Sequence, residues 1–177
     1  GNDSRYRNQS VTWNIFEEVL ADGPHPADYE ANAREIANVL FKDRGSKSQP
    51  FFANAARDIF ANMIIYFIRR NRDNPSNWED KLNNYDFVSF LLRKSPSQFV
   101  QYFKIYPDMH GLITYIGDGN NNQSLGVIGE LRSMLYDCFQ GVFYQKPSRA
   151  NPSFSIRPAI RSKQGNTIFI LSDMSLG

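Results

Sequence analysis

The sequence has few of the residues from which reactive sites are built. Cys138 is the only cysteine among 177 residues, so the chain has no internal disulfide and a zinc site built from thiolates is disfavoured. Such sparse cysteine is typical of a reducing compartment. The only histidines, His25 and His110, lack the spacing of a helical metal pair. We therefore predict no metal site and no cofactor.

Motifs for nucleotide hydrolysis are also missing. No G-x-x-x-x-G-K-[ST] loop occurs, and the loop that holds Gly117 and Gly119 has no following Gly-Lys pair. The apolar residues before Asp173 resemble the metal-holding strand of nucleotide hydrolases, but that strand needs the missing loop as its partner. Cys138 lies on an apolar helix stripe, where cysteine is an inert packing residue. The chain is therefore predicted not to be an enzyme.

Long apolar runs are absent too. The most apolar run, residues 63–68, is followed at once by Arg69 and Arg70. A membrane span needs about 20 apolar residues, so the sequence predicts neither a transmembrane helix nor a signal peptide.

What the sequence does have is apolar periodicity at helical spacing, in a chain that is 41% hydrophobic and 14% aromatic. The pattern is strongest over residues 51–70, which we predict to be the central core helix. The fold class that follows is mainly α: an orthogonal bundle of about six to seven helices, with short extended segments at both ends.

Capping residues predict where several helices begin. Asp28, Ser76 and Ser124 are expected to start helices, and Ser95 does so with a first-position Pro96 and a capping-box Gln98. The segment from residue 146 to 158 contains three prolines and is predicted to be loop with at most a short helical turn. The helix opened by Ser124 has a predicted apolar stripe of Leu125, Ile128, Leu131, Leu135, Cys138 and Val142.

The final hydrophobic stretch, residues 165–173, reads as a β-strand without an earlier partner of similar strength. A lone strand leaves its backbone groups unpaired, so we expect its sheet to lie in a longer protein from which this chain was cut. The predicted division is an incoming segment (1–20), a helical domain (21–164) and a returning strand (165–177).

Basic residues form three small groups, although the formal net charge is only +2. The first two are candidate nucleic-acid contacts, and cations at a helix C-terminus also have the simpler role of offsetting the helix dipole. The third group, which precedes the final strand, is a weaker candidate. The candidate contacts are Lys42, Arg44 and Lys47 in one loop and Arg69, Arg70 and Arg72 at the end of the central helix; the third group is Arg157, Arg161 and Lys163.

Three stretches together resemble one family, the type IV secretion coupling proteins of the TraG/TraD type. Residues 11–16 (VTWNIF) are similar to the "V-x-W-N-P-F" segment after that family's nucleotide-binding strand, although Ile15 stands where the family often has proline. Residues 51–57 (FFANAAR) are similar to the start of its long central helix. Residues 124–135 (SLGVIGELRSML) resemble its late helix.

The resemblance implies an all-α domain inserted into a RecA-like motor, with its two ends close together. In that family the motor is a membrane-anchored hexameric ATPase, and the helical domain faces the cytoplasm and engages substrate. The expected function is recognition of DNA or the relaxosome in conjugation, without catalysis. The alternative is a protein-docking module that binds a relaxase or a secreted effector and does not contact DNA.

Overall fold

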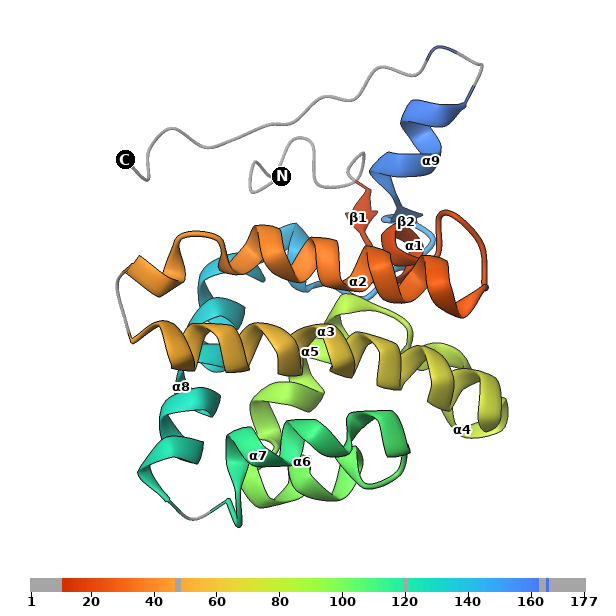
Figure 1. Cartoon of the computed structure of the whole chain (residues 1–177). Coiled ribbons are helices and arrows are strands. Elements are labelled where there is room, and N and C mark those ends of the chain that lie inside the picture. Colours follow the sequence, from red (N-terminus) through yellow and green to blue (C-terminus); the bar gives the residue numbers. More distant parts are fainter. Residues whose placement is uncertain (1–10, 47–48, 120, 163–164, 166–177) are drawn as a thin grey trace.

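The computed structural model describes residues 11–46, 49–119, 121–162 and 165. Over these residues it has nine α-helices, of which four are only four to six residues long, so the prediction of a mainly α bundle is confirmed (Figure 1). The helices are α1 (Ile15–Val19), α2 (Pro26–Phe41), α3 (Pro50–Asp73), α4 (Pro75–Trp78), α5 (Asn84–Arg93), α6 (Pro96–Phe103), α7 (Ile113–Ile116), α8 (Asn122–Cys138) and α9 (Ile156–Arg161); the strands are β1 (Thr12–Trp13) and β2 (Ser153–Phe154). Short 3₁₀ turns are η2 (Arg44–Ser46), η3 (Glu79–Lys81), η4 (Pro107–Leu112) and η5 (Gly141–Tyr144).

The core is built around α3, as its periodicity predicts. This helix runs antiparallel to α2 and packs against α8 (Figure 1). On its buried face the Phe67 ring lies 5.0 Å from that of Phe87 and 5.1 Å from that of Phe90. By length and composition alone α3 could span a membrane, but 72% of its most apolar window is buried inside the bundle. It is therefore the core helix of this fold.

Three of the four predicted helix-capping residues are wrong, because other residues precede those helices. The cap of α2 is His25, whose Nδ1 accepts from the Ala27 amide, and not Asp28. Asn74 precedes α4 and Asn121 caps α8, where Ser76 and Ser124 were expected. In α2 and α4 a proline occupies the first helical position, so the cap is the residue directly before that proline. The capping box of Ser95 and Gln98 is confirmed.

The apolar stripe of α8 differs from the predicted one at both ends. Leu125 is 60% exposed, whereas Val127 and Met134 are fully buried. The cause is a close approach between helices, because a Cβ on Gly126 would lie 2.9 Å from the Phe52 ring of α3. Glycine at this position therefore fixes which face of α8 meets α3. At the other end Val142 lies in η5, beyond the helix.

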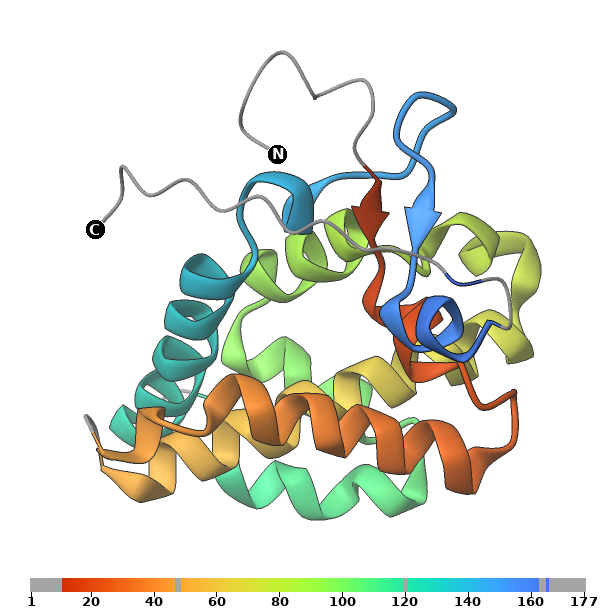
Figure 2. The ribbon, with the colours of Figure 1, turned by 90° about the horizontal axis from the view of Figure 1, so that it is seen from above.

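The first and last described segments lie side by side. β1 and β2 pair in parallel, with Thr12 opposite Ser153 and Trp13 opposite Phe154 (Figure 2). We call this pair, with the adjoining residues 14 and 155–157, the neck. The segment from 146 to 158 is thus more ordered than expected, because it forms β2 and the first turn of α9. The predicted terminal strand, apart from Gly165, and residues 1–10 of the incoming segment lie outside the described residues.

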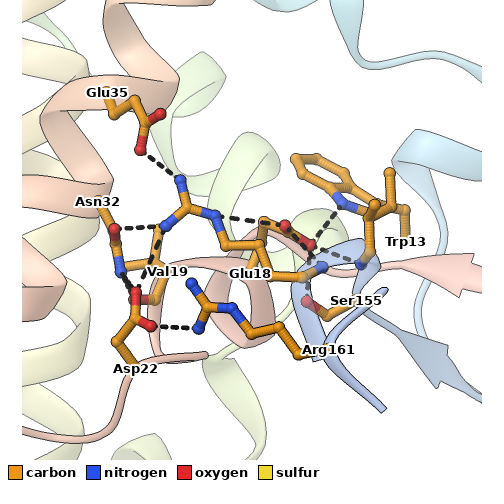
Figure 3. Close-up of polar contacts among 10 residues, drawn as sticks. Trp13, Glu18, Val19, Asp22, Asn32, Glu35, Ser155 and Arg161 are labelled. Atoms are coloured by element: carbon orange, nitrogen blue, oxygen red, sulfur yellow. Dashed lines mark hydrogen bonds and ion pairs between the residues drawn. The ribbon is translucent and has the colours of Figure 1, made fainter. Parts of the chain in front are cut away.

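A buried carboxylate, Glu18, holds the neck together. Its oxygens accept hydrogen bonds from the Ser155 hydroxyl at 2.6 Å and from the backbone amides of Ile156 at 2.7 Å and Arg157 at 3.1 Å (Figure 3). The Trp13 indole also donates to it, at 3.4 Å. Glu18 therefore satisfies the amides that α9 leaves free at its N-terminus, and it joins segments almost 140 residues apart.

Arg157 extends this network onto α2. Its guanidinium pairs with Glu18 at 3.6 Å and with Asp22 at 3.5 Å, and it also donates to Asn32 and Glu35 of α2 (Figure 3). Charged hydrogen bonds of this kind are stronger than neutral ones. The neck is consequently fixed to the helical body as well as to itself.

We expect the substitution Glu18→Gln to lower the free energy of unfolding by about 3 kcal/mol, because it removes one partner of a buried ion pair. Glu35→Gln is the matched control: Glu35 also pairs with Arg157, but its side chain is 64% exposed, so the loss should stay below about 1 kcal/mol. Urea unfolding followed by circular dichroism measures both. Equal losses would show that the burial of Glu18 has no special role.

Candidate nucleic-acid interface

The first predicted basic group is largely occupied within the protein. Arg44 lies in η2 and pairs with Glu130 of α8 at 3.2 Å and with Asp137 of the same helix. Its guanidinium also donates to the Ser133 hydroxyl at 3.2 Å. Lys42 is exposed just after α2, and Lys47 lies outside the described residues. Arg44 thus attaches the loop before α3 to α8, and its charge is compensated there.

The three arginines of the second predicted group lie in three different environments. Arg69 is 13% exposed and pairs with Glu30 and Asp108, each at 2.8 Å. These contacts raise the pKa of Arg69 and lower that of Asp108. Arg70 lies over the Trp78 ring, at 5.8 Å from its centroid. Arg72 is exposed and pairs with its neighbour Asp73.

The structure does not bring these two groups together. They lie at opposite ends of α3, whose 24 residues extend over roughly 36 Å at 1.5 Å per residue. In the third group Arg157 and Arg161 belong to the network at the neck, and Lys163 lies outside the described residues. Within the described part of the chain, the three groups therefore do not form a single basic face.

A groove that the sequence did not reveal lies between α4, η3 and α5. It has a volume of about 340 Å³ and combines aromatic walls with cations at its edge. The lining residues are Phe67, Asn77, Trp78, Lys81, Tyr85, Asp86, Ser89, Phe90, Arg93 and Lys94.

The cations of this groove are uncompensated, unlike Arg44 and Arg69. Within the described residues neither Lys81 nor Arg93 has a carboxylate partner, and both are exposed. The Lys94 ammonium lies 4.8 Å from the ring centroid of Phe90. The one acid that lines the groove, Asp86, pairs with Lys146 at 3.2 Å. Among its lining residues the groove therefore carries three cations and one acid.

The position of the groove is set by the neck. The side chain of Asn84, at the start of α5, donates to the Trp13 carbonyl at 2.8 Å and accepts from the Ile15 amide at 2.9 Å. Asn14 donates to the Leu82 carbonyl at 3.0 Å. The start of α5, which lines the groove from Tyr85 onward, is consequently hydrogen-bonded to the first described strand and the residues that follow it.

The sequence contained only a weak signal for this groove. Lys81, Arg93 and Lys94 are spread over two helical elements and form no run of charge. The available hint was the alternation of aromatic and basic residues from 78 to 94, which is also typical of an ordinary amphipathic helix. The fold was needed to place these residues around one hollow.

Among the described residues the histidines and the cysteine make structural contacts. Among the described residues no cluster of three potential metal ligands occurs. His25 caps α2, and the His110 ring contacts the Lys104 carbonyl. Cys138 is half-buried, and burial raises the pKa of its thiol. This agrees with a packing role for Cys138.

Comparison with protein families gives a match over residues 6–175, to the type IV secretion-system coupling protein DNA-binding domain. The chain belongs to this family. Searches among curated proteins and among solved structures find no match. The resemblance noted from three stretches of sequence is thereby confirmed, and the bundle is the DNA-binding, all-α domain of a coupling protein.

The ion pair of Arg69 predicts a pH dependence of stability. Because Arg69 lowers the pKa of Asp108, the pair stabilises the folded state above the usual carboxyl pKa of about 4, and this contribution is lost as the pH falls below that value. We expect Asp108→Asn and Arg69→Gln each to flatten the acid side of a plot of unfolding free energy against pH. An unchanged slope in both variants would contradict the pairing.

Proposed function

We propose that this domain holds DNA by its phosphate backbone for a coupling protein on the cytoplasmic side of a membrane, and has no catalysis of its own. ATP hydrolysis would belong to a hexameric motor elsewhere in the parent protein. The observation that carries the proposal is the groove between η3 and α5, where Lys81, Arg93 and Lys94 line one hollow and have no carboxylate partner among the residues that the structure describes.

Electrostatics favours this groove over the basic groups predicted from the sequence. Affinity for DNA comes from cations that release condensed counterions when they meet phosphates. Arg44 and Arg69 already have carboxylate partners, so a phosphate would have to displace these. Arg70 borders the groove through its contact with Trp78 and fits the same interface. Lys42 and Arg72 remain proposed secondary contacts.

The alternative is a module that docks a relaxase or a secreted effector. Its support is the set of exposed apolar side chains away from the groove, Val39 on α2 and Leu125 and Tyr136 on α8, together with the small net charge. Exposed apolar residues of this kind are typical of protein contacts when they form one patch. A complete lack of DNA binding at low salt would favour this alternative.

The decisive experiment is fluorescence-anisotropy titration with labelled DNA at several salt concentrations. We expect the triple variant Lys81→Gln, Arg93→Gln, Lys94→Gln to bind more weakly. The slope of log affinity against log salt for a single strand should become shallower by about two, because three phosphate contacts are lost. The change should be similar for different base sequences, since phosphates carry no sequence information.

Lys42→Gln is the control, because Lys42 is an exposed cation at the other end of α3. It should change the affinity and the salt slope much less than the triple variant. If Lys42→Gln has the larger effect, the contact lies at the loop before α3 and the assignment to the groove is wrong.

A further inference from the structure

We propose that the groove between α4, η3 and α5 receives unpaired bases, which stack on Tyr85, so that it is a site for single-stranded nucleic acid. This inference rests on the proposed function, and it adds a base-stacking contact in this groove and the residue that makes it. It is carried by the juxtaposition of an exposed aromatic ring with uncompensated cations in one hollow.

Tyr85 has the geometry of a stacking platform. Its ring is 38% exposed and lies 5.2 Å from the Tyr144 ring, at an angle of 32°. The Tyr144 hydroxyl forms a hydrogen bond of 2.8 Å with Ser89, which fixes the supporting ring. One side of Tyr85 is therefore backed by a second ring, and the ring also lines the groove.

A second aromatic residue of the lining, Trp78, is also packed against neighbours. The Trp78 ring meets that of Phe67 edge to face, with 4.9 Å between centroids, and Arg70 lies over it. Tyr85 follows Asn84, whose side chain is bonded to the strand at the neck. Both aromatic residues are thus held in place before a ligand arrives, which lowers the entropic cost of binding.

The size and charge of the hollow favour single strands. Its volume of about 340 Å³ is that of a small-ligand pocket, which suits separate nucleotides and not a whole double helix. In a duplex both faces of each base are covered by neighbouring base pairs, whereas every base of a flexible single strand can present a face to an aromatic ring. Lys81, Arg93 and Lys94 would meet the adjoining phosphates.

Of the acids near the hollow, Asp86 alone lines it. Asp86 is paired with Lys146, and the exposed Glu79 and Asp80 of η3 do not line the hollow. Of the uncharged and acidic polar groups in the lining, Asp86 and Ser89 are already bonded to Lys146 and Tyr144. The main contact we propose is stacking, which tolerates different bases because every base has a π-face.

The experiment compares the affinities of an oligothymidylate, an abasic strand of the same length and a duplex of the same length. Tyr85→Leu should weaken oligothymidylate binding about tenfold, which is within the range for loss of one base–aromatic stack. Tyr85→Phe keeps the ring and should bind like the unmodified protein. The abasic strand should bind about as weakly to the unmodified protein as oligothymidylate binds to Tyr85→Leu, and Tyr85→Leu should not weaken it further.

Tyr136→Leu is the matched control, since Tyr136 is an exposed tyrosine on α8 outside the groove. If Tyr85→Leu weakens duplex and single strand equally, or if the abasic strand binds as well as oligothymidylate, base stacking is refuted. Salt-dependent binding through the three cations would still stand in that case. If the unmodified protein binds none of the three ligands at low salt, the proposed function fails as well.

Discussion

The fold depends on one buried negative charge. Glu18 is removed from solvent, and a carboxylate in that position is tolerated only when donors surround it. Its donors come almost entirely from the other end of the chain: the Ser155 hydroxyl, two amides at the start of α9, and the Arg157 guanidinium. The first and last described segments must therefore meet for either to be stable. Parallel pairing of β1 with β2 follows from that meeting.

Two asparagines connect the neck to the candidate site by hydrogen bonds. Asn14 and Asn84 form hydrogen bonds between the first strand and the segment that begins α5, so the neck sets the position of Tyr85 and the rest of the groove wall. Amide side chains suit this task because each can donate and accept at once. The groove is consequently a product of tertiary contacts between segments about 70 residues apart.

Sequence alone predicted the parts of the structure that local pattern determines. The buried stripe of α3 and the capping box before α6 follow from residues a few positions apart, and both are confirmed. The cap of α8 was missed although it is local: Asn121 accepts a hydrogen bond from the Ser124 amide. The exposure of Leu125 did not follow, because the orientation of α8 depends on the contact of Gly126 with Phe52. The neck was missed for the same reason: β2 and α9 are stabilised by a carboxylate almost 140 residues away.

The difference between local pattern and tertiary contact also explains why basic groups in a sequence are a poor guide to a nucleic-acid interface. The partners of Arg44 lie about 90 residues away and those of Arg69 lie 39 residues away, so both cations look free in the sequence and are paired in the fold. With a net charge of only +2, internal pairing decides which cations remain for phosphates. Those around the groove remain, and helix α5, which lines the groove, begins at the neck. A displacement of β1 would act on α5 directly through Asn84, which connects the proposed DNA contact to the first described strand.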